Sequence, residues 1–376
     1  MQSDMGNIMV KDKQPKSNSQ TSDQPHYGAR NHKSARHLAL WLYALSALVA
    51  LMVMVGGATR LTDSGLSITQ WDLLMGALPP MSEEKWVEEF ELYRQIPEYE
   101  HVNKGMSLAE FKGIYWWEWS HRNLGRFIGM AFLIPFLIFL WRGDIASRGL
   151  KLKLGGAFVL LMGQGLMGWL MVKSGLTERV DVSQYRLAAH LFLAFLFYAV
   201  LLWMAFHLSL RRSGKPLVKA FQWARWLTLL VSIQILLGAL VAGLRAGKTF
   251  NTWPLMSGNF IPEGYFKSPA HWQDIFETIA AVQFNHRIMA YIVICAGFVF
   301  WFFTRRFGKA ASRRAGWILM ALTAQMFLGI WTLLSAVPIG LGLAHQLGAL
   351  GVLSLCVYFL YWSAPESPGR SNAESS

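Results

Sequence analysis

Long apolar stretches constrain this chain more than any other feature, because each is long enough to cross a lipid bilayer. A spanning helix needs about 20 predominantly apolar residues. We predict eight such helices, at residues 38–56, 121–141, 153–172, 187–209, 226–244, 287–304, 315–335 and 343–363. The last two come from one uncharged stretch, which Pro338 and Gly340 divide. The predicted fold class is therefore an all-α polytopic membrane protein.

The distribution of charge predicts the orientation of these helices. Only 15% of residues are charged, against about 25% in soluble proteins. The N-terminal tail and residues 142–153, 211–220 and 305–314 are basic, whereas loop 57–120 holds eleven acidic and five basic residues. Basic loops stay on the cytoplasmic side, so we predict cytoplasmic termini in a bacterial inner membrane. The net charge of +13 is then explained by topology and not by nucleic-acid binding.

Internal similarity predicts two matching halves. WSHRNLGRFIG (119–129) resembles FNHRIMAYIV (284–293), MGQGLMGWLMVKSG (162–175) resembles TAQMFLGIWTLLSA (323–336), and RLAAHL (186–191) resembles GLAHQL (342–347). Four spans per half give the repeats one orientation, as in parallel repeats about the membrane normal. We therefore predict two pseudo-symmetric four-helix bundles.

The predicted domain organisation follows from these spans. It consists of a disordered cytoplasmic tail (1–37), an N-terminal half (38–210) with outer loop 57–120, a cytoplasmic linker (211–225), a C-terminal half (226–363) and a C-terminal tail (364–376). Within the outer loop, residues 83–100 predict a short amphipathic helix.

Four of the ten histidines, His121, His190, His286 and His345, lie near the outer ends of the even-numbered spans. A single histidine there is most often solvated or hydrogen-bonded. A set of four at one depth, repeated between the halves, favours ligation, because ionisable residues at membrane depth are costly. Zinc and copper sites need a third or fourth His, Cys or carboxylate ligand, whereas each half offers only two histidines. Two facing imidazoles in a helical bundle suit the axial positions of a haem iron.

Arginines occur at the same predicted level as the histidines. Arg122 and Arg287 follow His121 and His286 directly, and Arg60 and Arg245 align between the halves. Guanidinium groups there would pair with haem propionates. Anchoring to lipid headgroups is an equally good interpretation.

One difference separates the halves. Glu118 stands three residues before His121, whereas Gln283 stands at the matching place before His286. A carboxylate in one half only is expected if that half performs chemistry that needs a proton acceptor or a negative charge. The alternative is a glutamate that favours the first turn of a helix through the helix dipole.

The sequence resembles the haem A synthase family from about residue 38 to residue 363. The resemblance is carried by GGATRLTDSGLSITQWDLLMGALPP (56–80), EWSHRNLGR (118–126), AAH (188–190), NTWPLMSG (251–258), QFNHR (283–287) and AHQLGA (344–349). It implies an oxidoreductase that converts the ring-D methyl group of haem O to a formyl group, giving haem A for terminal oxidases. It also implies that His286 and His345 ligate a haem b, that His121 and His190 hold the iron of the substrate haem, and that Glu118 is catalytic.

The two cysteines, Cys295 and Cys356, lie in apolar runs, so the outer-loop cysteine pair of some family members is absent here. This chain is similar to the mitochondrial-type subgroup, and no outer-loop disulfide is available to carry electrons. Expected partners are haem O, membrane lipid, the haem O synthase and an electron-transfer protein, with homo-oligomerisation left open.

Two other functions use many of the same features. A b-type cytochrome electron carrier needs the same four histidines but gives no reason for the Glu118/Gln283 difference. A transporter would also have parallel repeats. However, transporters carry charged or broken helices near the midplane, whereas the polar features here collect at the outer rim.

Overall fold

The computed structural model describes residues 27–70, 75–176, 181–210, 216–266 and 272–365. Across these residues the chain is helical, with two isolated β-bridges and no named strand. The long helices are α1 (His32–Leu61), α4 (Leu108–Trp141), α5 (Arg148–Lys173), α6 (Gln184–Ser209), α7 (Val218–Gly243), α9 (Ile279–Thr304), α10 (Lys309–Leu334) and α11 (Ile339–Ser363). The short ones are η1 (Met75–Ala77), α2 (Glu83–Tyr93), α3 (Pro97–His101), η2 (Ala246–Lys248), α8 (Asp274–Glu277) and η3 (Arg305–Phe307).

Among the described residues, eight helices are long and apolar enough to cross a membrane, as predicted. Each predicted span falls on one of them to within a residue. The break at Pro338 is also confirmed, because Pro338 is the N-cap of α11 and the preceding Ala336 and Val337 have positive φ angles.

Several helices begin earlier than their apolar stretches. α4 begins at Leu108, where Ser107 and Glu110 form a reciprocal capping box, and its first turns are too polar to count as a membrane span. α1 begins at His32 behind the N-cap Asn31, so the helix includes the end of the segment predicted as a disordered tail. Likewise α7 begins at Val218, within the predicted linker. Residues 1–26 and 366–376 of the tails and residues 211–215 of that linker lie outside the described residues.

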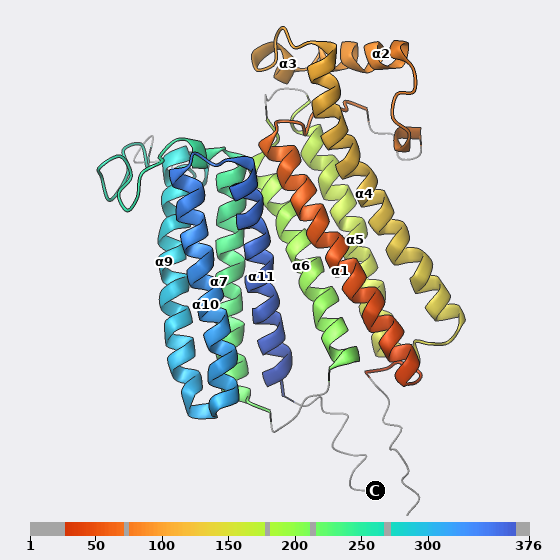
Figure 1. The fold of residues 1–376 in the computed structure, drawn as a ribbon, viewed down its shortest axis with the longest axis vertical. Coiled ribbons are helices and arrows are strands. Elements are labelled where there is room, and N and C mark those ends of the chain that lie inside the picture. The colour runs from red at the N-terminus through yellow and green to blue at the C-terminus, as the bar shows by residue number, and fades with distance from the viewer. Residues whose placement is uncertain (1–26, 71–74, 177–180, 211–215, 267–271, 366–376) are drawn as a thin grey trace, which may run out of the picture.

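Figure 1 shows α1, α4, α5 and α6 on one side of the molecule and α7, α9, α10 and α11 on the other. Neighbouring helices pack within each group, but α6 also packs against α7, and α1 against α11. The division into two bundles therefore stays a prediction. We call the end of the long helices nearest α2 and α3 the loop end, and the opposite end, where α1 begins and α11 finishes, the tail end (Figure 1).

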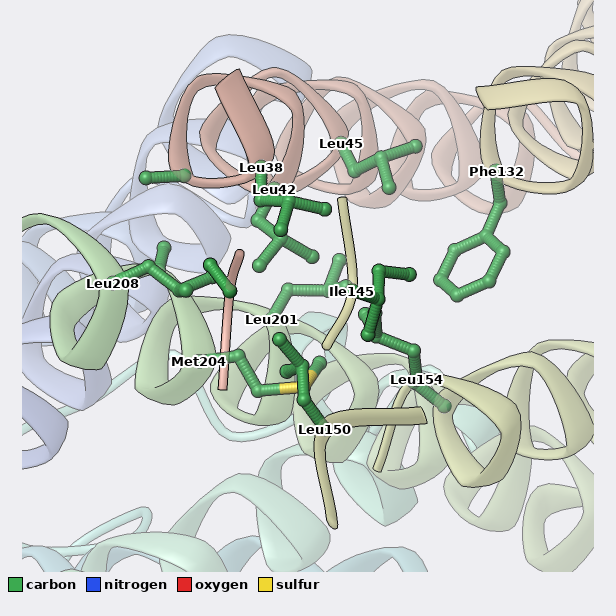
Figure 2. Close-up of a cluster of buried hydrophobic side chains, with 14 of the residues drawn as sticks. Leu38, Leu42, Leu45, Phe132, Ile145, Leu150, Leu154, Leu201, Met204 and Leu208 are labelled. Atoms are coloured by element: carbon green, nitrogen blue, oxygen red, sulfur yellow. The ribbon is translucent and has the colours of Figure 1, made fainter. Parts of the chain in front are cut away.

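Densely packed apolar cores occupy the tail end of both groups. In the first group the core includes the fully buried side chains of Leu38, Leu42, Phe132, Leu154 and Leu201 (Figure 2). The second group has a comparable cluster built on Phe300, Ile318 and Phe359. Burial of these side chains stabilises the tail end through close packing.

Helices α2 and α3 lie beyond the loop end of α4 (Figure 1). α2 covers most of the predicted amphipathic segment, and its buried residues Trp86 and Tyr93 pack with Phe111 and Tyr115 of α4. This aromatic cluster fixes the outer loop on the extended first turns of α4, above the level of His121.

Candidate active site

The four predicted histidines all lie on the loop-end side of the apolar cores. They belong to four different helices: His121 to α4, His190 to α6, His286 to α9 and His345 to α11. His121 and His190 lie close enough to interact electrostatically, and so do His286 and His345. Sequence analysis predicted these two pairs, and the fold brings them together.

Each histidine ring lies against a glycine of a neighbouring helix. A Cβ atom would stand 3.0 Å from the His121 ring at Gly56, 3.1 Å from His190 at Gly168, 3.0 Å from His286 at Gly238 and 2.7 Å from His345 at Gly329. A contact of 3.0–3.1 Å is tighter than a Cβ normally makes, and one of 2.7 Å is closer than a Cβ can come, so a side chain at these positions would push the rings aside. We call these four glycines the glycine cradle, because each lets a histidine ring lie close against a neighbouring helix.

The donor set fits a haem better than a bare metal ion. Among the described residues, no group of three or more His, Cys, Asp or Glu side chains could hold a metal, whereas a haem iron needs only two axial ligands from the protein. The Nδ1 atom of His190 is buried without a hydrogen-bond partner in the described structure. The paired imidazoles, with one ring nitrogen of His190 unpartnered in the described structure, are compatible with a haem in each pair.

Glutamines from neighbouring helices hold three of the histidines. The amide nitrogens of Gln164, Gln234 and Gln325 donate to the backbone carbonyl oxygens of His190, His286 and His345, at 3.0, 3.1 and 2.7 Å. The internal repeat had aligned Gln164 with Gln325, but Gln234 was missed. The available signal was the spacing Gln-x-x-x-Gly, which occurs at 164–168, 234–238 and 325–329.

Glu118 is buried, with only 2% of its surface exposed. One carboxylate oxygen accepts hydrogen bonds from the Ser67 hydroxyl and the Ile68 amide, both at 2.8 Å. The other accepts from Arg122 Nε at 3.1 Å and Nη2 at 2.6 Å. Arg122 also donates to the carbonyl oxygens of Ile68 and Gln70. Glu118 therefore accepts four hydrogen bonds, and the two from Ser67 and Ile68 hold the segment after α1 against α4.

Gln283 stands in a matching frame in α9 and is equally buried, at 2% exposure. Its side-chain oxygen accepts from Arg287 Nη2 at 3.2 Å, and its amide donates to the Ala246 carbonyl oxygen at 2.9 Å. Arg287 donates to the carbonyl oxygens of Phe250 and Thr252, just as Arg122 does to Ile68 and Gln70. The two frames differ chiefly in one group, a carboxylate against an amide.

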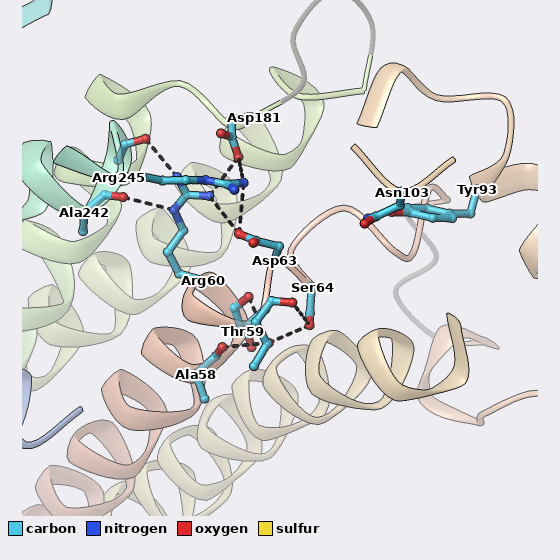
Figure 3. A network of polar contacts seen from close by, with 12 residues as sticks. Ala58, Thr59, Arg60, Asp63, Ser64, Tyr93, Asn103, Asp181, Ala242 and Arg245 are labelled. Carbon is cyan, nitrogen blue, oxygen red and sulfur yellow. Dashed lines mark hydrogen bonds and ion pairs between the residues drawn. The ribbon is translucent and has the colours of Figure 1, made fainter. Parts of the chain in front are cut away.

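Arg60 and Arg245 meet at the loop end between the two helix groups (Figure 3). Arg60 donates to the carbonyl oxygens of Ala242 and Gly243 at the end of α7 and pairs with Asp181 at 2.8 Å. Arg245 pairs with the same Asp181 oxygen at 2.8 Å and with Asp63 at 2.9 Å. Neither aspartate was predicted as part of the site. Asp63 lies in the segment 56–80 that carries the family resemblance, but nothing in the sequence indicates its pairing with Arg245, and Asp181 lies in none of the quoted motifs.

Two of the predicted arginines keep a donor without a partner. The Nε atoms of Arg245 and Arg287 are buried and make no hydrogen bond within the described structure. A cavity of about 280 Å³ lies beside Arg287, lined by Trp253, Phe284 and Tyr291 among others. A larger cavity of about 480 Å³ lies between α5, α6, α7 and α11 and touches none of the four histidines, so we do not assign it to this site.

Glu98 in α3 is a further buried carboxyl group near the site, 4% exposed, with one oxygen that has no partner in the described structure. Burial raises its pKa to about 8, and the negative charges of Glu118, Asp181 and Asp63 act in the same direction. No sequence motif had singled it out.

Comparisons with known proteins agree with this geometry. The family model described as cytochrome oxidase assembly protein matches residues 39–357. A haem A synthase of Parvibaculum lavamentivorans is 50% identical over 339 residues, 90% of this chain and 98% of that protein. One of Bradyrhizobium diazoefficiens is 51% identical, covering 86% of this chain and 90% of its own. One of Nitrosospira multiformis is 47% identical, with 88% and 94% covered. The chain belongs to the cytochrome oxidase assembly protein family, in which these relatives are haem A synthases.

Proposed function

We propose that this protein is a haem A synthase, an oxidoreductase of the membrane that converts the ring-D methyl group of haem O to the formyl group of haem A. Support comes from the near full-length similarity to haem A synthases. The two histidine pairs offer two axial ligands each, enough for a substrate haem and a resident haem in the same chain.

The assignment of roles to the halves rests on one observation. Glu118 and Gln283 occupy matching frames, each bonded to the arginine four residues later. A buried carboxylate belongs to the half in which charge develops, so His121 and His190 bind the iron of the substrate haem. His286 and His345 bind a haem b, which supplies electron-transfer chemistry when bound.

The contacts of Glu118 favour one of its two predicted roles. Its oxygens accept four hydrogen bonds, two of them from a guanidinium group. Such bonds stabilise the charged carboxylate, so Glu118 acts as a fixed negative charge beside the reacting substituent. Stabilising positive charge that develops there lowers the barrier, because the charge is already oriented before reaction.

The arginines bind the carboxylate groups of the haems. The free Nε–H groups of Arg245 and Arg287 are suitable donors to propionates. Arg122 and Arg60 act mainly by holding the frame, since Arg122 pairs with Glu118 and Arg60 with Asp181. Both termini lie in the cytoplasm, and the haem sites lie toward the periplasm, according to the distribution of basic loops. The haem O synthase, an electron-transfer protein and a second copy of the chain stay predicted partners.

The test is the haem content of the protein purified from cells that supply haem O, measured by chromatography with mass detection. We expect haem b together with haem A or its hydroxylated precursor. Haem b alone, with haem O available, would contradict the synthase and support the alternative, a b-type cytochrome electron carrier. Protein without any haem would contradict both.

A further inference from the structure

The fourth histidine, His121, lacks the glutamine that holds the other three. The equivalent of Gln234, four residues before the cradle glycine, is Met52, which precedes Gly56 in α1. Gly56 lies against the His121 ring as Gly238 lies against the His286 ring. Relative to these glycines, Met52 therefore occupies the place of Gln234.

Contacts agree with this equivalence. The Cε atom of Met52 would lie 3.1 Å from a Cβ at Gly125, one turn beyond His121 in α4. Met52 thus faces α4 beside the histidine, as Gln234 faces α9 beside His286. A thioether has no N–H or O–H group, so Met52 cannot donate to the carbonyl oxygen or to the ring of His121.

Each glutamine restrains its histidine through the backbone. The amide nitrogen donates to the backbone carbonyl oxygen of the histidine and lies against the imidazole, 3.1–3.4 Å from a ring nitrogen. An imidazole that binds iron through one nitrogen carries a proton on the other, so the bond to the carbonyl oxygen is the restraint that persists with a haem bound. One such hydrogen bond contributes about 1 kcal/mol, which is roughly fivefold in the ratio between a held and a displaced histidine. Among the described residues, His190, His286 and His345 have this restraint, and no glutamine donates to His121.

We propose that His121 is the releasable ligand of the substrate haem, and that Met52 is the positioning residue that leaves it releasable. Release of His121 opens the iron to a small neutral ligand, such as a diatomic gas or water, on the side that carries Glu118. His190 remains the retained ligand. In the C-terminal half both ligands are held, so the haem there stays closed to such ligands. The proposal rests on the proposed function, since it needs a haem in each pair.

The test uses purified protein that carries both haems, reduced and exposed to carbon monoxide. In the unmodified protein we expect carbon monoxide to bind one haem of the two. Met52→Gln supplies the missing donor and lowers the carbon-monoxide-reactive fraction about fivefold, with a matching gain in the low-spin six-coordinate absorption spectrum. Met52→Leu, which has no donor either, retains the reactivity of the unmodified protein.

A second variant, Gln234→Met, tests the proposal even if Met52→Gln folds poorly. Gln234→Met removes the restraint on His286, and we expect carbon monoxide to react with the second haem as well. Retained haem with unchanged reactivity in both Met52→Gln and Gln234→Met would overturn the proposal. A protein that carries no haem at the first pair would instead overturn the proposed function, so the two failures are distinguishable by haem stoichiometry.

Discussion

The two halves of this molecule share a scaffold and differ in the groups that control reactivity. In both, an arginine clamps the loop after the first helix by two carbonyl oxygens and bonds the side chain four residues earlier. That side chain is a carboxylate in α4 and an amide in α9. The adjacent histidine is held by a glutamine only in the second half. These differences support the proposal that the N-terminal half holds the reacting haem and the C-terminal half the resident one.

The strongest way to separate the halves is to remove one ligand. His286→Ala leaves the resident haem with a single axial histidine, so we expect near-complete loss of the b-type absorption spectrum. The substrate pair His121 and His190 is unchanged and should still copurify with haem O or haem A. Mass-resolved haem analysis measures both. An unaltered b-type spectrum would mean that the ligand assignment is wrong.

Filling the glycine cradle tests the pairs without touching a ligand. A Cβ at Gly329 would lie 2.7 Å from the His345 ring, and overpacking of this kind costs about 1–3 kcal/mol. We expect Gly329→Ala to weaken binding of the resident haem by roughly tenfold, seen as a lower haem-to-protein ratio. The matched control is Gly316→Ala in the same helix, where the nearest atom is at 3.4 Å. Equal haem loss in both variants would point to a general effect on α10.

The charge network at the loop end tests how far the halves depend on each other. Asp181 accepts from both Arg60 and Arg245, but it is about a third exposed, so solvent screens the pairs. We expect Asp181→Ala to lower the free energy of unfolding by about 1 kcal/mol, measured by thermal denaturation in detergent. Asp63→Asn loses the close ion pair to Arg245 only and keeps a residue type that tolerates the left-handed backbone at this position, so it should cost less. A larger loss in Asp63→Asn would contradict this account of the network.

Protonation of Glu98 makes the stability of the protein depend on pH. Its ordinary pKa is 4.5, and burial raises it to about 8 in the folded protein. The folded state therefore binds the proton more tightly, and stability falls as pH rises through this window. Glu98→Gln removes the titration, so its melting temperature should exceed that of the unmodified protein at about pH 9 and match it at about pH 5. Glu100→Gln changes an exposed residue of the same helix and leaves Glu98 in place, so its melting temperature should follow that of the unmodified protein at both pH values.

Sequence patterns predicted the membrane helices well, because hydropathy acts over whole helices. The internal repeat indicated the two histidine pairs, whose role as haem ligands stays a prediction. The sequence patterns missed the start of α4, since its first turns are polar, although the Ser107–Glu110 capping box is readable in the sequence. Asp181 and Glu98 could not be found, because their significance depends on which loops meet at the loop end. Gln234 could have been found from its spacing to Gly238.

The most direct test of the central claim is the haem composition of Glu118→Gln in cells that supply haem O. The side-chain oxygen of a glutamine can still accept from the arginine four residues later, as that of Gln283 does, whereas its amide nitrogen loses the bond that the Ile68 amide donates to Glu118. The account predicts that the variant retains haem b and haem O while haem A and its precursor fall to background. Haem A at the level of the unmodified protein would contradict the claim that the Glu118 half is the reacting half.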